Sequence, residues 1–219
     1  MIKLDIISDI ACPWCYVGKA YLDRALEARC DHPFAIEWHP YQLNPEMPKD
    51  GIDRRAYMEA KFGGKDGAVR AYAPLVEHAQ QAGIELNLDR ISRTPNTLEA
   101  HRVIHWAGLE GRQTPMVAAL FRALWREGRD VGDAGTLADL AGEVGLDREM
   151  IARLLASDAD ADEIRARATH ARERGVNAVP TFIIADRHVV QGAQPRETWD
   201  RIIADIAGQI ADRAGDATE

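Results

Sequence analysis

The strongest constraint on the fold is that strand-like segments stand only near the two ends of the chain. The segments with apolar runs or alternation typical of β-strands are 2–7 (IKLDII), 34–45 (FAIEWHPYQLNP), 179–185 (VPTFIIA) and 188–192 (HVVQG). A helical pattern covers residues 14–29. A second one, over 196–214, carries an apolar stripe of Trp199, Ile202, Ile203, Ile206 and Ile210. Because strands must pair to satisfy their backbone, both ends should meet in one α/β sheet domain.

The middle of the chain has a different character. From about Asp53 to Gly175 it is Ala-rich and helical, without a fixed-period repeat, and several segments end on Gly, which favours helix C-caps. We therefore expect a discontinuous sheet domain made of residues 1–48 and 176–219. Residues 49–175 should form an inserted, all-helical domain that covers the sheet.

Composition excludes several classes of partner. The formal charge is −8, from 27 Lys and Arg against 35 Asp and Glu, with no basic block, so nucleic acid is not an expected partner. No apolar run approaches the ~18–20 residues of a membrane span. Lys3, Asp5 and Asp9 interrupt the N-terminal apolar residues, so we expect no signal peptide, no membrane contact and a cytoplasmic location. Three cysteines in such a compartment argue against a disulfide framework.

Cys12 and Cys15 stand where the first strand gives way to the first helix, in the sequence CPWC. Residues i and i+3 at a helix start share one face, at ~5–6 Å between Cα atoms, which suits a redox-active disulfide. Unpaired N–H groups and the helix dipole favour a thiolate at Cys12, the expected nucleophile, while Cys15 would be the shielded resolving thiol. Pro13 suits the first helical position, and Trp14 offers an apolar face beside the sulfur.

A structural zinc site is the main alternative for this pair, and it lacks ligands. Such a site needs four ligands, and the only other cysteine, Cys30, would lie ~25 Å away along the helix. His101 and His105 are four residues apart, but Arg102 stands where a zincin motif carries Glu. We therefore expect no metal site, and we interpret Cys30 as a semi-buried hydrophobe at a helix end.

Pro180 immediately precedes a predicted strand, in the sequence VPTF. A cis Val179–Pro180 bond would turn the chain sharply and leave the backbone of Val179 free to hold an extended substrate. An ordinary trans proline at the start of a strand is the alternative.

With both Cys12-Pro13-Trp14-Cys15 and Val179-Pro180-Thr181-Phe182 in place, the chain resembles the thioredoxin superfamily. More narrowly, it resembles the DsbA-like oxidoreductases of the FrnE type. The segments that carry this resemblance are SDIACPWCYVG, WHPYQLNPEMPKDG, NTLEAHRVIHWA, LFRALWREGRDVGD, GVNAVPTFII and VVQGAQP. The resemblance implies a thioredoxin fold with a large inserted helical domain, Cys12 as nucleophile, Cys15 as resolving thiol, and a cis Pro180 packed against them.

The chain departs from the family pattern at three positions. Ala178 stands where the family usually has Gly. Ile6 replaces an acid that many superfamily members bury, so proton transfer to Cys15 should use water or another group, with Asp9 as a candidate. Trp14 stands where the secreted DsbA enzymes carry His, which implies a less oxidising couple.

These observations predict a thiol–disulfide oxidoreductase that exchanges disulfides with protein or small-thiol substrates. Its substrate groove would lie beside Trp14 and Val179, with Asn96 and His101 as further lining candidates, although capping of a helix explains Asn96 nearly as well. We expect no tightly bound cofactor, leave glutathione open as the reductant, and expect a monomer or a homodimer.

Two alternatives remain open. A related branch, the 2-hydroxychromene-2-carboxylate isomerases and kappa-class glutathione transferases, shares the inserted helices but has serine at the first motif position and uses glutathione. The second alternative is a binding or chaperone-like module with a vestigial thiol pair.

Overall fold

The computed structural model describes residues 1–29 and 32–216 of the 219-residue chain, so the prediction for Cys30 lies outside the described residues. The strands of the main sheet are β1 (Ile2–Ser8), β2 (Phe34–Pro40), β5 (Thr181–Ile184) and β6 (His188–Gln191). Their order is β2-β1-β5-β6, with β1 and β2 parallel and the other neighbours antiparallel. Both ends of the chain therefore build one sheet, which confirms the predicted α/β fold.

Strand β1 is central, and its sequence suits that place. Leu4 and Ile6 are fully buried, and Ile6 lies opposite Trp38 of β2 and Phe182 of β5. A strand that has neighbours on both sides and helices on both faces is buried on both faces, so its sequence must be almost continuously apolar. The strand predicted over 34–45 ends at Pro40.

The helices occupy the remaining length, mostly between β2 and β5. They are α1 (Pro13–Glu27), α2 (Arg54–Phe62), α3 (Lys65–Ala82), α4 (Leu98–Leu109), α5 (Gln113–Arg122), α6 (Ala134–Glu143), α7 (Arg148–Leu155), α8 (Ala161–Glu173) and α9 (Arg196–Asp216). A 3-10 turn (Leu88–Arg90) precedes α4, and α5 continues into a π-helical turn (Ala123–Glu127). The helical character of the insertion is thus confirmed.

The ends of several helices follow local capping chemistry. Asp53, Asp133 and Asp147 each accept a hydrogen bond from the backbone N–H three residues on, at 2.8, 2.7 and 2.9 Å. Gly63 and Gly83 end α2 and α3 in the left-handed conformation, with φ of 71° and 69°, where a side chain would be strained.

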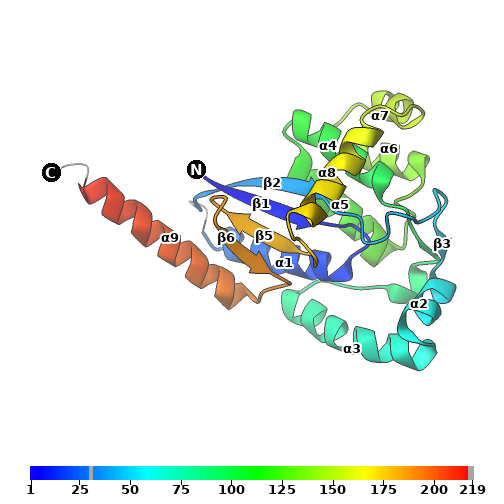
Figure 1. Ribbon diagram of the computed structural model, residues 1–219, viewed down its shortest axis with the longest axis horizontal. Helices are drawn as coiled ribbons and strands as arrows, with labels where there is room; N and C mark the ends of the chain where they lie inside the picture. Colours follow the sequence, from blue (N-terminus) through cyan, green and yellow to red (C-terminus); the bar gives the residue numbers. More distant parts are fainter. Residues whose placement is uncertain (30–31, 217–219) are drawn as a thin grey trace.

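One element was not predicted. Strands β3 (Ile52–Asp53) and β4 (Arg93–Thr94) form a small antiparallel ladder inside the helical insertion. It ties the start of α2 to the segment that leads into α4, and so holds α2 and α3 as an arm beside the sheet (Figure 1). Two-residue strands are too short to show any periodicity in the sequence.

The apolar core runs without a break from the sheet into α4, α5 and α6. Trp125, in the π-helical turn, is buried and donates its indole N–H to the carbonyl of Ile10, just after β1, at 2.9 Å. The core is therefore shared, and the division of the chain into a discontinuous sheet domain and an inserted helical domain at residues 49–175 stays a prediction.

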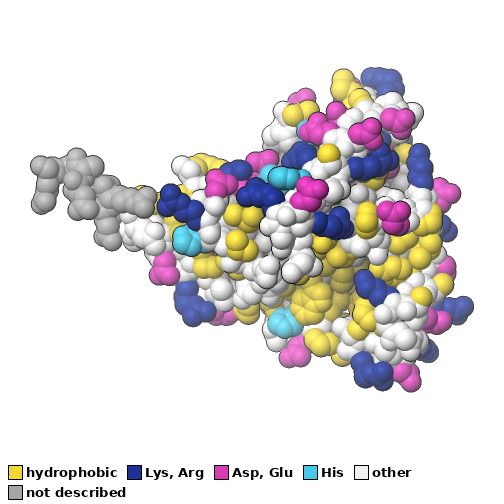
Figure 2. Space-filling view, viewed as in Figure 1, with side chains coloured by type: hydrophobic (Ala, Val, Ile, Leu, Met, Phe, Trp, Pro, Cys, Tyr) yellow, Lys and Arg dark blue, Asp and Glu magenta, His cyan; other side chains and the backbone are white. Residues whose placement is uncertain are grey.

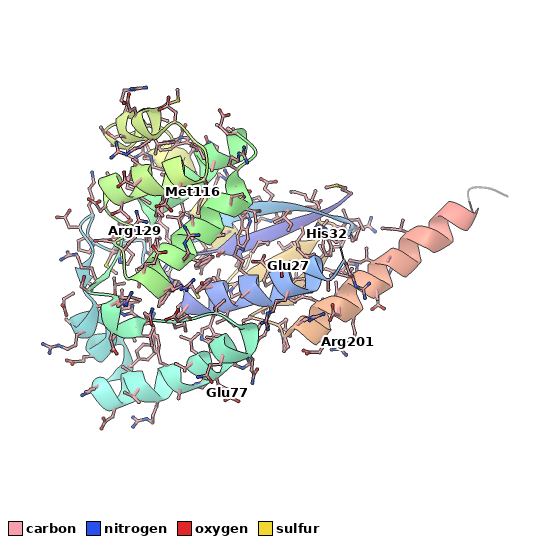
Figure 3. All side chains as sticks on the ribbon, turned by 180° about the vertical axis from the view of Figure 1, so that it is seen from behind. Glu27, His32, Glu77, Met116, Arg129 and Arg201 are labelled. Atoms are coloured by element: carbon pink, nitrogen blue, oxygen red, sulfur yellow. The ribbon has the colours of Figure 1, made fainter. Side chains whose placement is uncertain are left out.

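Helix α9 packs on α1 and then leaves the body of the protein (Figure 1). Figure 3 shows this from behind, with Glu27 at the end of α1 near the helix that carries Arg201. Trp199 and Ile203 are buried as the apolar stripe predicted, but Ile210 is 45% exposed because the helix has passed the sheet edge by then. Within the described residues, none of the helices combines the length and apolar character needed to cross a bilayer.

Candidate active site

The two motif cysteines sit at the junction of β1 and α1. Cys12 is the N-cap residue of α1, with φ −94° and ψ 111°, and Pro13 is the first helical residue. The N–H of Cys12 donates to the carbonyl of Asp9 at 3.0 Å, and the N–H of Cys15 donates to the carbonyl of Cys12 at 3.1 Å. Both are free thiols; Cys12 is 5% and Cys15 1% exposed. The predicted placement of the pair at a helix start is what the structure shows.

A proline turn from the far end of the chain lies against Cys12. The Val179–Pro180 peptide bond is cis, and the Cys12 Sγ donates to the carbonyl of Val179 across 3.6 Å. The hydroxyl of Thr181 donates to the carbonyl of Ala178 at 2.7 Å and shapes the turn. Ala178 is not among the described residues with positive φ, so the alanine meets no backbone strain there.

Gly18 permits this close approach of α1 to the proline turn. A Cβ at position 18 would lie 2.9 Å from Cγ of Pro180 and 3.4 Å from Cα of Ala193. Real Cβ atoms do not approach other carbons so closely, so glycine at this position lets the helix that carries both cysteines pack on Pro180.

Cys15 lies in a protected environment. Burial raises the pKa of its thiol well above the ordinary value of 9.0, and the neighbouring Cys12 raises it further. Hydrogen bonding to the side chain of Ser8 and to the backbone of Asp9 lowers it in part. Cys15 is therefore held as a neutral thiol against the end of β1.

Cys12 borders a cavity of about 170 Å³, most of whose wall belongs to the insertion. Its apolar lining from α2 and α3 is Tyr57, Met58, Phe62, Tyr72 and Leu75, and Pro13 and Trp14 line it beside Cys12. Figure 2 shows hydrophobic side chains gathered in the hollow between the α2–α3 arm and the rest of the protein. The volume suits a side chain or a small thiol rather than a large cofactor.

Two cations are held in the cavity wall by aromatic rings. The guanidinium carbon of Arg54 lies 5.7 Å from the ring centre of Tyr72, and Nη2 of Arg54 donates to the Tyr72 hydroxyl at 3.1 Å. Lys61 donates to the hydroxyl of Tyr57 at 2.9 Å, and that hydroxyl donates to Oδ1 of Asn44 at 3.0 Å. The cavity is thus apolar with a positive rim.

The sequence reasoning missed these residues, although a signal was present. The segment RRAYMEAKF carries Tyr57, Met58 and Phe62, yet no residue of α2 is fully buried. Apolar side chains on a helix that contributes little to the core are typical of a binding surface.

Trp14 is held by α3. Its ring meets that of His78 edge-on, with centroids 5.3 Å apart. The hydroxyl of Tyr21, on α1, lies 3.1 Å from Nδ1 of His78 and within hydrogen-bond distance of Gln81 Oε1, at 3.2 Å. These contacts hold the indole of Trp14, which belongs to the cysteine motif, against α3 of the insertion.

Of the predicted substrate-binding residues, only Val179 is brought to Cys12. Asn96 donates to the carbonyl of Met47 at 2.6 Å and accepts from the N–H of Leu98 at 2.9 Å, while the N-cap residue of α4 is Thr97, so Asn96 holds the turn just before the helix. His101 is 4% exposed and lies outside the cavity wall, because its face of α4 turns toward the end of the sheet. Substrate binding by Asn96 and His101 stays a prediction that this geometry does not support.

Possible metal ligands gather elsewhere. The donor atoms of Asp5, Glu37 and His39 lie within 4.8 Å of one another. Lys3 lies 3.0 Å from Asp5, and His39 lies 2.6 Å from the same carboxylate, so this cluster already has its own cations and hydrogen bonds. Neither motif cysteine belongs to a metal-ligand cluster within the part of the chain that the structure describes.

Comparison with known proteins agrees with this geometry. A family model described as a DSBA-like thioredoxin domain matches residues 3–204. The chain is similar to the solved structure of a probable DsbA oxidoreductase, SCO1869 of Streptomyces coelicolor. The sequence identity is 31% and the TM-score 0.82, over 95% of this chain and 91% of that one. The thioredoxin fold with a helical insertion, implied by the motifs, is therefore confirmed.

Two more distant structures share the fold. The cytosolic disulfide reductase DsbM of Pseudomonas aeruginosa, solved with GSH, has a TM-score of 0.68 and 21% identity, over 95% of this chain and 99% of that one. A 2-hydroxychromene-2-carboxylate isomerase also has a TM-score of 0.68 and 21% identity, over 99% of this chain and 100% of that one. At this identity the likeness concerns the architecture alone.

Proposed function

The chain belongs to the family of DsbA-like thioredoxin domains, and on this premise we propose that it is a FrnE-type thiol–disulfide oxidoreductase working through Cys12 and Cys15. The observation that carries the proposal is the contact between Cys12 Sγ and the Val179 carbonyl, at 3.6 Å, on the border of the apolar cavity. This contact places the thiol of Cys12, at the start of a helix, next to both the backbone of Val179 and the apolar cavity.

The reaction is two successive exchanges. The Cys12 thiolate attacks a substrate disulfide, a bond forms between Cys12 and one substrate sulfur, and the other sulfur leaves as a thiolate that takes a proton. Cys15 then attacks Cys12, and the first substrate sulfur leaves as a second thiolate. The substrate disulfide is reduced to two thiols while the protein pair is oxidised to a disulfide; the reverse sequence oxidises a dithiol.

The substrate segment would lie extended along Val179, with a neighbouring side chain or a small thiol in the cavity beside Trp14. Substrates would be proteins or small molecules that carry a disulfide or thiols. Because DsbM is cytosolic and was solved with GSH, we also propose a cytoplasmic location and glutathione as the reductant that restores the pair.

Reduction of insulin by a small-thiol reductant tests this function. Cys12→Ser should abolish the acceleration, because no nucleophile remains at the helix start. Cys15→Ser should accumulate a mixed disulfide with the substrate, visible as a mass adduct that dithiothreitol removes. Full turnover by the Cys12→Ser protein would contradict the proposal.

The shared architecture with the isomerase keeps a glutathione-dependent isomerase or transferase as the second candidate. It would be preferred if the double variant Cys12→Ser, Cys15→Ser bound glutathione tightly and kept full activity on such a substrate.

A further inference from the structure

The cavity beside Cys12 carries positive charge that nothing in its wall balances. Arg54 and Lys61 both line it, and none of the lining residues that the structure describes is an aspartate or a glutamate. The chain as a whole is acidic, with 35 Asp and Glu against 27 Lys and Arg, so its composition does not account for this local excess of cations. A cleft lined by one sign of charge beside the reactive thiol indicates that the opposite charge comes with the substrate.

Arg54 is the deeper of the two cations. It is half-buried, whereas Lys61 is exposed. The guanidinium carbon of Arg54 lies 5.2 Å from the ring centre of Trp125, which is 1% exposed, and Nη2 of Arg54 donates to the hydroxyl of Tyr72 at 3.1 Å. A guanidinium presents its N–H groups in a planar fork that matches a carboxylate. The aromatic contacts therefore hold Arg54 in place and leave further N–H groups for an anion.

A buried hydroxyl in the same wall lacks a partner. Thr94 is 4% exposed and lines the cavity, and its Oγ1 forms no hydrogen bond with any described residue. A buried hydroxyl without a partner calls for an explanation, because leaving it unpaired costs free energy. Like the guanidinium of Arg54, this hydroxyl can donate to a carboxylate oxygen. Two independent donors in one cavity wall thus point to an anionic ligand group.

The small ladder of β3 and β4 explains why Arg54 and Thr94 belong to one wall. Thr94 of β4 lies opposite Ile52 of β3. Directly after β3, the backbone N–H of Arg54 donates to the carbonyl of Ser92, just before β4, at 2.9 Å. The ladder therefore fixes the start of α2, with its cation, beside the strand that carries the hydroxyl.

We propose that Arg54 and Thr94 form a subsite for a carboxylate of the substrate, so that disulfides with a short acidic branch are the preferred substrates. The proposal rests on the function proposed above, because the subsite matters only if Cys12 attacks the disulfide. The reaction keeps its balance: the reduced protein and one disulfide give the Cys12–Cys15 disulfide and two thiols, and no other reactant takes part.

The size and lining of the cavity define this branch. At about 170 Å³ the cavity is smaller than the ~300–1,000 Å³ of typical small-molecule pockets, so it holds one short branch rather than a whole tripeptide such as glutathione. Its apolar lining is Tyr57, Met58, Phe62, Tyr72 and Leu75. These side chains contact the carbons between the reacting sulfur and the carboxylate. They also exclude water from the ion pair, which strengthens it.

Three linear disulfides that differ in their end group test the subsite. Dithiodipropionate, hydroxyethyl disulfide and cystamine end in a carboxylate, a hydroxyl and an ammonium group. In a Cys15→Ser protein the first exchange accumulates as an adduct that mass spectrometry measures. Dividing each rate by that of free N-acetylcysteine with the same reagent removes differences in intrinsic reactivity. This relative rate should be about 10- to 100-fold higher for dithiodipropionate than for hydroxyethyl disulfide, the range of a charge-assisted hydrogen bond, and lowest for cystamine.

Substitutions in the same Cys15→Ser protein assign the preference to the two residues. Arg54→Gln should remove most of it and leave the rate with hydroxyethyl disulfide unchanged. Thr94→Val should lower it about three- to tenfold without loss of stability in urea, because the hydroxyl that it removes has no partner in the fold. Arg55→Gln is the matched control, since the side chain of Arg55 is 87% exposed and does not line the cavity. Oxidised glutathione, whose carboxylates end longer branches, should depend little on Arg54.

Equal relative rates for the three disulfides without any further substitution would overturn the subsite, even if a variant fails to fold. An equal loss with all three reagents in Arg54→Gln would also overturn it, because the cation would then act on the Cys12 thiolate or on packing. A loss with oxidised glutathione alone would overturn the short acidic branch. A Cys15→Ser protein that forms no adduct with any reagent would defeat the oxidoreductase function itself, which separates the two failures.

Discussion

The two thiols of the motif face opposite parts of the molecule. Cys12 borders a cavity half of whose lining residues belong to α2 and α3 of the insertion, with aromatic rings and cations at its rim. Cys15 is 1% exposed and belongs to the continuous apolar core that includes the sheet. In the proposed function this contrast divides the tasks: the insertion would select what binds, and the buried thiol would resolve the bound disulfide.

The largest expected effect is on the free energy of unfolding, and it tests whether the insertion and the sheet form one folding unit. Arg102 of α4 is fully buried and donates to the carbonyls of Leu154, Ser157 and Ala159 at 2.9, 2.8 and 2.7 Å. Arg102→Met leaves these acceptors unpaired and should cost about 3–5 kcal/mol of unfolding free energy in urea. Arg165→Met, at an exposed ion pair, should cost under about 1 kcal/mol.

Because the core is continuous, Arg102→Met should still unfold in a single transition. Two separate transitions, seen by far-ultraviolet circular dichroism and by tryptophan fluorescence, would show instead that the insertion is an independent domain.

The second-largest expected effect concerns the close contact between α1 and the proline turn, on the sheet side of the active site. Gly18→Ala places a methyl group 2.9 Å from Cγ of Pro180 and should destabilise the protein by about 1–3 kcal/mol. It should also lower insulin reduction at least tenfold, because the proline turn moves away from Cys12. Gly208→Ala, in the open part of α9, should be neutral or stabilising by about 1 kcal/mol. Wild-type activity of a folded Gly18→Ala protein would show that the close approach is dispensable.

The pH dependence of stability should come from Cys15. Its folded-state pKa is raised, so above pH 9.0 the unfolded chain loses this proton before the native protein does. Stability is then complete below about pH 9.0 and falls as pH rises toward the folded pKa, by at most about 1.4 kcal/mol per pH unit. Burial also raises the pKa of Tyr16 and Tyr21, so the measured quantity is the difference from Cys15→Ala in urea unfolding. Equal slopes for the two proteins would contradict the prediction.

The smallest effect tests the rim of the cavity. Lys61→Gln removes an exposed cation and should slow the first exchange with the anionic Ellman's reagent about two- to fivefold, consistent with under about 1 kcal/mol for a surface charge. The effect should fade in high salt and be absent with neutral hydroxyethyl disulfide. Lys65→Gln, outside the cavity, is the control. An equal loss with both reagents would point to packing rather than charge.

Local patterns predicted most of the secondary structure, because helix caps and the spacing of Cys12 and Cys15 depend on residues within one or two turns. They predicted less where tertiary packing overrides them. Ile210 continues an apolar stripe that has no sheet beneath it, and the ladder of β3 and β4 is too short to leave a pattern.

The sequence by itself determined an α/β fold closed by its two ends, with a thiol pair at the start of the first helix and a proline turn before a late strand. Only the tertiary structure decided that Val179 meets Cys12 across 167 residues, that α2 and α3 wall the cavity, and that His101 turns inward beside Ser8. The physical reason is the separation along the chain over which each kind of interaction acts. Periodicity and caps act within a few residues, whereas contacts and burial depend on how distant segments pack in space.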